Sequence, residues 1–265
     1  MPQRPIGVFD SGVGGLSVLR RIRTDLPSEH LHYVADSGHA PYGDKSAEFI
    51  ASRSLAIAKF LVDAGAKALV VACNTATAAA ISSLRGKFDI PIVGVEPAVK
   101  PAVAATRSGV IGVLATSGTL ESGKFAQLTA RFGSAAKVIV QPCPGLVEQV
   151  ERGELTSDKT RMLLATFVRP LVDQGADTLV LGCTHYPFLA PLLRQLVGEE
   201  IALIETSAAV SRQLARQLQA RGWLADGDAI GSVRCWSSGP TQHLAELLPQ
   251  LWGQALAVTP LPTCD

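Results

Sequence analysis

The feature of this 265-residue sequence that most constrains its fold is an internal repeat. Residues 62–75 align without a gap on residues 172–185, and seven of the fourteen positions are identical. Each copy carries an apolar run that ends in a cysteine, Cys73 in the first and Cys183 in the second. The repeat predicts two similar halves of about a hundred residues each, a usual size for a small domain.

Short runs rich in Val, Ile and Leu alternate along the chain with Ala- and Leu-rich stretches that have helical spacing. This alternation is typical of a parallel β-sheet that is covered by helices on both faces. The fold class that we predict is α/β, with two pseudo-symmetric domains built on mainly parallel sheets. Examples of the predicted helices are Ser46–Ala64 and Asp158–Gln174. The predicted strands are Ile6–Phe9, Leu31–Ala35, Ala68–Ala72, Ile92–Val95, Val110–Leu114, Lys137–Val140, Thr178–Leu181 and Ile201–Ile204.

Composition excludes several classes of protein. Hydrophobic residues make up 47% of the chain and charged residues 18%, with a formal net charge of +1, so neither disorder nor a basic nucleic-acid-binding surface is expected. No apolar run approaches the roughly 18 residues of a membrane span, and the first ten residues contain no signal-peptide core. We therefore expect a cytoplasmic protein with neither nucleic acid nor membrane as a partner.

The five cysteines are widely spaced and include no Cys-x-x-Cys pair. Their spacing predicts neither a disulfide framework nor a zinc site, so no metal is expected. A cysteine outside such patterns is either a small buried apolar residue or a reactive thiol. We expect Cys143, Cys235 and Cys264 to be structural.

Cys73 and Cys183 both follow predicted strands, and ligands of open α/β sheets bind at the carboxyl ends of the strands. If the two domains face each other, the two thiols approach one cleft from opposite sides. Alternatively, both cysteines are duplicated, half-buried residues without a role in chemistry. The polar pairs that follow them, residues 74–75 and 184–185, favour the cleft because such side chains are unusual in a packed core.

A glycine-rich segment, residues 11–17, follows the first predicted strand and precedes a helix, where backbone N–H groups bind anions. It lacks the lysine of a P-loop, and Ser17 stands where the dinucleotide motif needs glycine. The segment is therefore either a carboxylate site or an ordinary turn. Asp10, just before it, is either an N-cap of that helix or an acid that pairs with a substrate ammonium group or tunes a thiol.

Other polar residues have both a functional and a structural interpretation. The loop 36–45 is either functional or a solvated surface loop. His185 is placed to support the Cys183 thiolate, although it is also consistent with a structural histidine. Glu151 fits an ordinary acid on a helix surface. The pair formed by His30 and His32 has no neighbouring ligand residues and is expected at the surface.

Two opposed thiols allow a specific reaction. A thiolate on one face of a carbon removes a proton, and a thiol on the other face returns one, which inverts the stereocentre. A cysteine hydrolase would need only one nucleophilic thiol, and a protein that merely binds amino acids would need none.

Five segments of the sequence closely resemble the cofactor-independent glutamate racemases, two-cysteine members of the aspartate/glutamate racemase family. They are residues 9–15, Asp36 with 41–43, 72–76, 94–98 and 182–187. The resemblance extends to about residue 210 and implies interconversion of L- and D-glutamate, without a cofactor, for peptidoglycan synthesis.

The resemblance also implies roles for individual residues. Cys73 would take the α-proton of D-glutamate with the assistance of Asp10, and Cys183 that of L-glutamate with the assistance of His185 and Glu151. Glu148 is the alternative to Glu151. The implied substrate contacts are Asp10, Ser11, Tyr42, Gly43, Asn74, Thr75, Thr116, Thr119, Thr184 and His185.

The same resemblance predicts domains of residues 1–97 plus 207–265 and of residues 98–206, an active site in the cleft between them, and a homodimer. The substrate is expected to be a small molecule, glutamate, with aspartate or a hydantoin as alternatives. Because almost nothing precedes Pro5, we do not expect the precursor-activated regulation of some family members.

Overall fold

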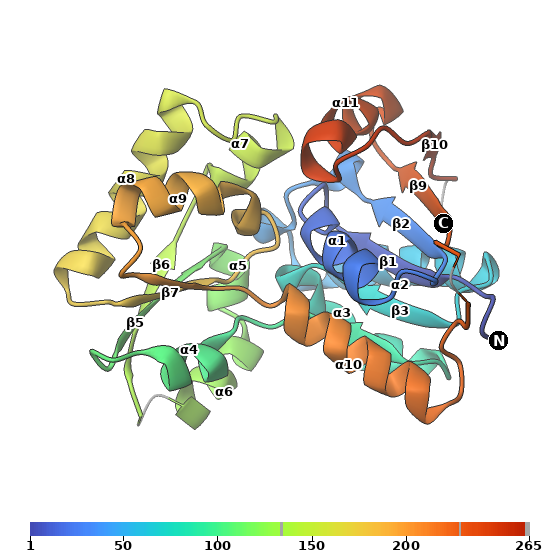
Figure 1. The fold of residues 1–265 in the computed structure, drawn as a ribbon, viewed down its shortest axis with the longest axis horizontal. Helices are drawn as coiled ribbons and strands as arrows, with labels where there is room; N and C mark the ends of the chain where they lie inside the picture. The colour runs from blue at the N-terminus through green and yellow to red at the C-terminus, as the bar shows by residue number, and fades with distance from the viewer. Residues whose placement is uncertain (133–134, 228, 263–265) are drawn as a thin grey trace. The chain divides into compact units, whose positions relative to one another are not determined.

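The computed structural model describes residues 1–132, 135–227 and 229–262, and its contacts divide the chain into two compact units. Unit 1 consists of Met1–Val95 and Ser207–Asp265, and unit 2 of Glu96–Thr206. Each unit is an α/β structure with its own sheet (Figure 1). All the strand pairs among these described residues are parallel, so the predicted fold class is confirmed.

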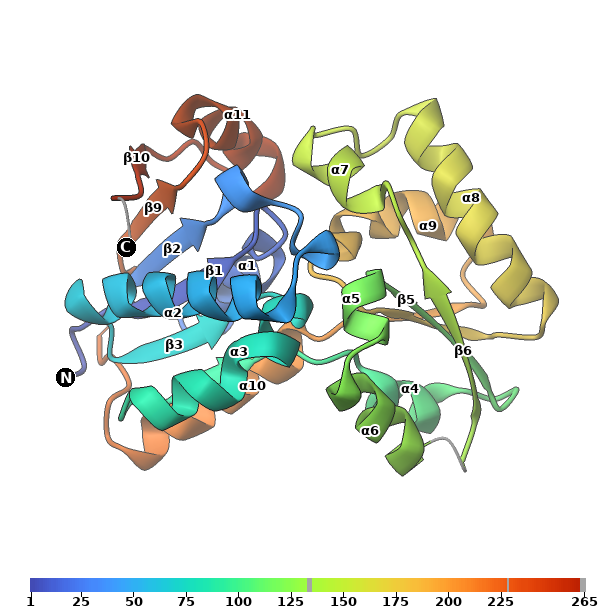
Figure 2. The ribbon, with the colours of Figure 1, turned by 180° about the vertical axis from the view of Figure 1, so that it is seen from behind.

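Unit 1 contains a six-stranded sheet in the order β10-β9-β2-β1-β3-β4. Helices α1 and α10 cover one face (Figure 1), and α2 and α3 cover the other (Figure 2). The strands are β1 Ile6–Asp10, β2 Leu31–Ala35, β3 Ala68–Val71, β4 Ile92–Gly94, β9 Val233–Ser237 and β10 Val258–Pro260. The α-helices are α1 Leu16–Asp25, α2 Ala47–Asp63, α3 Asn74–Lys87, α10 Ser207–Ala220 and α11 Thr241–Leu251, and the short 3-10 turns are η1 Ser37–His39 and η2 Tyr42–Asp44.

Unit 2 contains a four-stranded sheet in the order β6-β5-β7-β8. Helix α4 packs with α6, and α8 packs with α9. The strands are β5 Val110–Ala115, β6 Lys137–Pro142, β7 Thr178–Leu181 and β8 Ala202–Ile204. The helices are α4 Val99–Ala105, α5 Ser117–Leu120, α6 Gly123–Phe132, α7 Leu146–Glu151, α8 Asp158–Asp173 and α9 Ala190–Val197, with the 3-10 turn η3 Tyr186–Leu189.

All eight predicted strands are present, with ends that differ by at most two residues. Strands β9 and β10 were not predicted. Strand β9 alternates between buried and more exposed positions and includes Arg234, and β10 is a three-residue edge strand that ends in Pro260. Neither segment is a continuous apolar run, which was the signal of the other strands.

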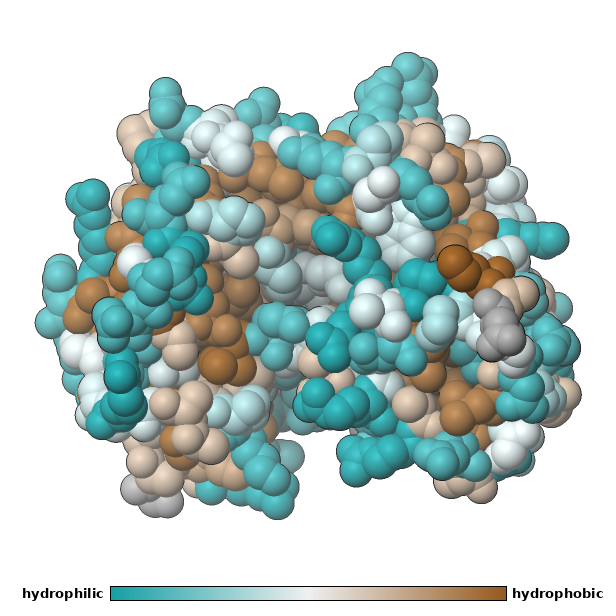
Figure 3. Space-filling view, viewed as in Figure 1, coloured by the Kyte–Doolittle hydropathy of each residue, from teal (hydrophilic) through white to brown (hydrophobic). Residues whose placement is uncertain are grey.

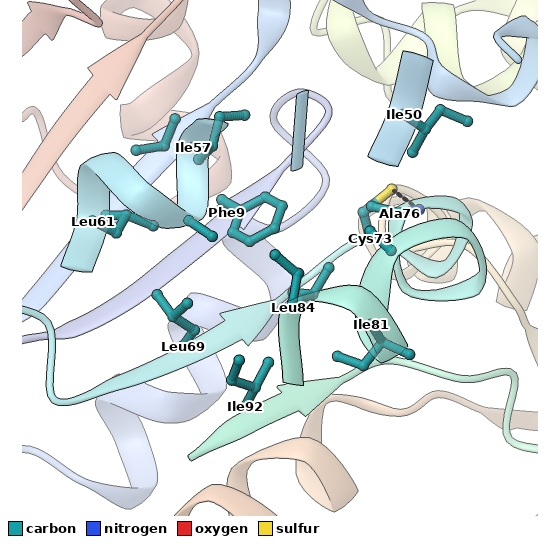
Figure 4. Close-up of a cluster of buried hydrophobic side chains, with 14 of the residues drawn as sticks. Phe9, Ile50, Ile57, Leu61, Leu69, Cys73, Ala76, Ile81, Leu84 and Ile92 are labelled. Carbon is teal, nitrogen blue, oxygen red and sulfur yellow. Dashed lines mark hydrogen bonds between the residues drawn. The ribbon is translucent and has the colours of Figure 1, made fainter. Parts of the chain in front are cut away.

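The core on one face of unit 1 leads directly to Cys73. Phe9 of β1, Leu61 of α2 and Leu84 of α3 pack together in this cluster, and each is fully buried (Figure 4). Cys73 belongs to the same cluster and is 5% exposed. The cluster therefore fixes the backbone on which this thiol is carried.

The repeat is visible in the packing of the two central strands, β1 and β5. A Cβ atom on Gly7 would lie 3.0 Å from Cβ of Leu61 on α2. A Cβ atom on Gly112 would lie 3.3 Å from Cβ of Leu171 on α8, and 2.8 Å from Cδ1 of the same side chain. Leu61 directly precedes one copy of the repeated segment and Leu171 the other. In each unit, therefore, a helix approaches its central strand at a glycine.

We expect Gly7→Ala and Gly112→Ala each to lower the free energy of unfolding by about 1–3 kcal/mol, because the added methyl group overpacks this contact. Urea unfolding followed by circular dichroism measures the loss. The control is Gly86→Ala in α3, where a Cβ would meet nothing within 4 Å. It should raise stability by about 0.5–1 kcal/mol through helix propensity. Equal stability of all three variants would contradict the packing argument.

A charged side chain anchors the segment that leads into each central strand. Lys67, which is fully buried, donates from Nζ to the carbonyls of Pro2 (2.6 Å) and Trp223 (2.7 Å) and pairs with Glu29 (2.6 Å). These contacts fix the chain before β1.

In unit 2 the matching position of the repeat is Asp177. Its Oδ2 accepts hydrogen bonds from the backbone N–H groups of Arg107 and Ser108, both at 2.7 Å, and its Oδ1 accepts from the Thr106 hydroxyl at 2.6 Å. Desolvation raises the pKa of this carboxyl. The hydrogen bonds together lower the pKa by more than desolvation raises it, so the pKa lies below its ordinary value. The two units thus use opposite charges at one position.

The prediction that His32 lies at the surface is wrong. This side chain is 8% exposed and contacts the Trp236 ring edge-on, with ring centroids 5.0 Å apart. Burial lowers its pKa to about 4, and the charges of Arg234 and His30 add to the effect. Within the described part of the chain, its Nδ1 atom has no hydrogen-bond partner. His32 is therefore a neutral core residue in the folded protein at neutral pH.

This burial makes stability depend on pH. The folded-state pKa of His32 is below the unfolded value of about 6.5, so protons bind preferentially to the unfolded chain between these values. We expect a loss on the order of 3 kcal/mol as the pH falls from about 6.5 to 4. Thermal unfolding of wild type and His32→Leu across this range measures it, and His30→Leu is the control. An equally steep loss in His32→Leu would contradict the assignment.

Hydrophilic side chains cover much of the face seen in Figure 3, with apolar side chains between them. Within the described part of the chain, no helix is both long and apolar enough to cross a membrane.

Candidate active site

The thiol of Cys73 lies at the N-terminus of a helix. Cys73 follows β3 and is the N-cap of α3, and its Sγ accepts a hydrogen bond from Ala76 N at 3.4 Å (Figure 4). The thiol also lies 3.8 Å from the Ser11 hydroxyl, to which it donates. Helix N-termini stabilise negative charge, so this position favours the thiolate, the reactive form of cysteine.

The glycine-rich turn folds around the carboxylate of Asp10. Asp10 ends β1 and is fully buried, and its two oxygens accept hydrogen bonds from the backbone N–H groups of Ser11 (2.7 Å) and Gly15 (2.5 Å). Tyr33 closes the turn by donating to the Gly12 carbonyl at 2.6 Å. The expectation that this turn offers these N–H groups to an external anion is therefore wrong for Ser11 and Gly15, because an internal carboxylate takes them.

Asp10 is not an N-cap of the next helix. Helix α1 begins after Gly15 and has no side-chain cap. A Cβ on Gly15 would lie 2.7 Å from Cβ of Asp10, so only glycine allows the turn to close this tightly on the acid. Asp10 also receives a 3.3 Å hydrogen bond from the Ser11 hydroxyl, the group that contacts the Cys73 thiol. The acid, hydroxyl and thiol form one chain of contacts.

Asn74 and Thr75 are the first two residues of α3 and are 6% and 7% exposed. The buried Oδ1 atom of Asn74 has no hydrogen-bond partner among the residues that the structure describes. A buried acceptor without a donor is costly, so this atom is suited to an N–H group of a ligand. Tyr42 and Gly43 lie in turn η2, where the Tyr42 hydroxyl donates to the buried Asp36 carboxylate at 2.6 Å.

Cys183 in unit 2 has different partners. It follows β7, is 8% exposed, and its Sγ lies 3.6 Å from Nδ1 of His185. The other ring nitrogen of His185, Nε2, lies 2.6 Å from Oε1 of Glu151 on α7. Of the two acids considered from the sequence, Glu151 is thus the one in contact with His185.

His185 is held in its charged form. Burial by itself lowers the pKa of this imidazole, but hydrogen bonds to Cys183 and Glu151, and the negative charges of these groups, raise it well above its usual value. An imidazolium beside a sulfur stabilises the thiolate. The Cys183 site therefore uses a side-chain ion pair, whereas the Cys73 site uses a helix N-terminus.

The threonines of unit 2 have separate positions. Thr116 is the N-cap of α5, and its hydroxyl donates to that of Thr119 at 3.0 Å. Thr119 and Thr184 are 2% and 4% exposed. Thr184 lies between Cys183 and His185 in sequence, and Thr116 follows the end of the neighbouring strand β5. The structure thus brings these hydroxyl groups to the carboxyl ends of adjacent strands.

Two other cysteines show different properties. Burial raises the pKa of Cys235 to about 12, and burial together with the charge of Cys183 raises that of Cys143. Both thiols therefore keep their protons at neutral pH. Cys264 lies outside the described residues. Across those residues, no group of three or more His, Cys, Asp or Glu side chains is arranged to hold a metal ion.

The interaction of Arg53 with Asp36 was not predicted from the sequence. Arg53 donates to both carboxylate oxygens, from Nη2 at 2.7 Å and Nε at 3.1 Å. The available signal was its position in α2, three residues after Ile50 and four before Ile57, on the side of the helix that is buried. A charged residue within such a stripe indicates a buried partner.

The class of protein is an α/β protein of two units, each built on its own parallel sheet and each with a cysteine just beyond a matching strand. The chain belongs to the Asp/Glu/Hydantoin racemase family, whose model matches residues 6–221. This confirms the resemblance found in the sequence.

Individual relatives support the same assignment. The chain is 58% identical over 260 residues to the glutamate racemase of Stutzerimonas stutzeri (strain A1501), covering 98% of each chain. Its fold is similar to a crystal structure of a glutamate racemase isoform from Bacillus anthracis, with a TM-score of 0.90, 33% identity and 99% of each chain covered. The Escherichia coli glutamate racemase, in complex with L-glutamate and the activator UDP-MurNAc-ala, matches with a TM-score of 0.85, 34% identity and 97% coverage of each chain.

Proposed function

We propose that the protein is a glutamate racemase, an isomerase that interconverts L- and D-glutamate and supplies D-glutamate for peptidoglycan synthesis. The observation that carries the proposal is 58% identity over nearly the whole length of a glutamate racemase. The thiol environments of Cys73 and Cys183 support it, because each contains a group that stabilises a thiolate.

The proposed mechanism uses two bases. Cys73 removes the α-proton of D-glutamate while Cys183 delivers a proton to the opposite face, and the reverse reaction exchanges their roles. Asp10 assists on the Cys73 side, and His185 with Glu151 on the Cys183 side. The mechanism requires that both thiols reach one α-carbon, so we propose that units 1 and 2 act as the two lobes of one active site.

We propose that the substrate is held by polar groups of both units. The orphaned Asn74 Oδ1 atom is suited to accept from the substrate ammonium group. The remaining proposed substrate contacts are Asp10, Ser11, Tyr42, Gly43, Thr75, Thr116, Thr119, Thr184 and His185. We further propose a cytoplasmic homodimer, for which analytical ultracentrifugation should give about twice the chain mass of 27.8 kDa.

The direct test is incubation with L-glutamate in deuterated water without pyridoxal phosphate. Racemisation predicts that optical activity is lost while the α-proton signal disappears from the NMR spectrum at a comparable rate. The control is the Cys73→Ala/Cys183→Ala double variant, which should show neither change. Exchange with aspartate and none with glutamate would overturn the substrate assignment, and no exchange with either would overturn the activity.

A further inference from the structure

A buried charged cluster lies beside the Cys73 site, and among its members only Tyr42 was proposed above to contact the substrate. Its centre is Asp36, which follows β2 and is fully buried. One carboxylate oxygen, Oδ1, contacts Arg53 Nη2 at 2.7 Å and His39 Nδ1 at 3.1 Å. The other, Oδ2, accepts from the Tyr42 hydroxyl at 2.6 Å and from Arg53 Nε at 3.1 Å. Arg53 thus holds the carboxylate through two N–H groups, the strongest geometry for such a pair.

The charge on Asp36 dictates the direction of the hydrogen bond with Tyr42. Burial raises the pKa of the Asp36 carboxyl, but hydrogen bonds, among them those from Arg53 and Tyr42, outweigh this effect. The pKa is therefore below its ordinary value, and Asp36 is ionised at neutral pH. A carboxylate only accepts hydrogen bonds, which forces the Tyr42 hydroxyl to donate. Burial and the Asp36 charge raise the pKa of Tyr42, so its proton stays in place. The Tyr42 side chain is therefore held by its hydrogen bond to the Asp36 carboxylate, which Arg53 stabilises in the charged form.

The hydrogen bond between Tyr42 and Asp36 lies close to the Cys73 thiol. Tyr42 and Cys73 belong to one cluster of buried side chains, together with Ile50 of α2. The charge of Cys73 is also among the causes of the raised pKa of Tyr42. In addition, the backbone N–H of Asp36 donates to the Asp10 carbonyl at 2.9 Å. These contacts connect the loop that carries Tyr42 both to the Cys73 thiol and to strand β1, which carries Asp10.

We propose that Arg53 is a positioning residue that acts through Asp36 to hold Tyr42, and with it the Tyr42–Gly43 segment, against Cys73. The inference rests on the proposed function for its effect on turnover. Its effect on Cys73 itself can be measured without any substrate. A lysine ammonium group cannot reproduce the planar, bidentate contact that Arg53 makes with the two carboxylate oxygens of Asp36, so this position requires arginine.

The first test is Arg53→Met. It leaves a buried carboxylate without its cation, which must then bind a proton or draw in water. The Tyr42 hydroxyl loses its fixed acceptor, and we expect kcat/KM for glutamate to fall roughly 10²-fold, the cost of a small misplacement at a reacting centre. For Arg53→Lys we expect kcat/KM to fall about tenfold, because lysine keeps the positive charge but lacks the bidentate guanidinium group.

The second test adds Asp36→Asn to Arg53→Met. The amide oxygen of asparagine accepts from Tyr42 without a charge that needs compensation, so the double variant should recover about tenfold in kcat/KM over Arg53→Met. Lys59→Met is the matched control, because Lys59 lies on the same helix and forms an exposed ion pair with Asp63. It should racemise like wild type. A double variant no better than Arg53→Met would show that Arg53 does not act through Asp36.

A third measurement separates this proposal from the proposed function. The rate at which iodoacetamide alkylates Cys73, followed by mass spectrometry of its peptide well below the melting temperature, reports how Tyr42 covers the thiol. We expect Arg53→Met to alkylate about tenfold faster than wild type, and the double variant to return toward wild type. Unchanged alkylation in folded Arg53→Met would overturn the proposal even if the enzyme racemises glutamate. Faster alkylation would support it even if the substrate is another amino acid.

Discussion

Replacement of either Cys73 or Cys183 with alanine should abolish racemisation of glutamate. In the proposed mechanism each thiol supplies one of the two proton transfers, and loss of such a transfer costs up to about 10⁴-fold in rate. Circular dichroism of the substrate measures the loss in both directions. Cys235→Ala is the matched control, because Cys235 is also a buried thiol of unit 1 and should leave turnover unchanged. Normal turnover in either active-site variant would contradict the two-base proposal.

The same variants distinguish the two thiols. With one base left, a proton can only leave and return on one face, so the α-carbon exchanges with deuterated water without inversion. We expect Cys73→Ala to exchange L-glutamate, through Cys183, and Cys183→Ala to exchange D-glutamate, through Cys73. The opposite pattern would mean that the faces assigned to the two cysteines are reversed.

Replacement of His185 with asparagine should have the next largest effect. The pKa of His185 is well above its usual value because of Cys183 and Glu151, so wild type keeps an imidazolium beside the sulfur at neutral pH. Without this cation the thiolate is less favoured, and we expect kcat at pH 7 to fall roughly 10²- to 10³-fold. The loss should shrink as the pH rises through the folded-state pKa of His185, because wild type then loses the same imidazolium.

The measurement is kcat against pH in each direction, and the fall should be larger with L-glutamate, for which Cys183 is the proposed base. His243→Asn, at an exposed position of α11, is the control. A pH profile parallel to that of wild type would contradict the role of the imidazolium. Since the folded-state pKa of His185 is raised, its contribution to stability is complete below about pH 6.5 and is lost as the pH rises through the folded-state value.

The fold could be predicted wherever burial determined the sequence pattern. Strands β1 to β8 are mostly short apolar runs, and the repeat aligns β3 with β7. The pattern failed at β9 and β10, where edge position and partial exposure permit polar residues and proline. It also failed at His32, because burial there depends on Trp236, which is distant in sequence.

The candidate site shows the same division. The cysteines and the polar residues after them could be located because strand ends of parallel sheets gather ligands. The partner of the glycine-rich turn could not, because the N–H groups of a turn bind an internal carboxylate as readily as an external one, and only the structure shows that Asp10 is the acceptor. The contact of Arg53 with Asp36 spans seventeen residues of helix and loop, beyond any local pattern.

Lys67 and Asp177 have a consequence for the evolution of the chain. The two residues stand at one position of a duplicated segment, but Lys67 faces carbonyl oxygens and Asp177 faces N–H groups. If genetic recombination exchanged the two copies, an aspartate would meet carbonyls and Glu29, and a lysine would meet amides, so both halves would lose stability. These two charges therefore make the copies non-interchangeable, although seven of their fourteen residues are identical.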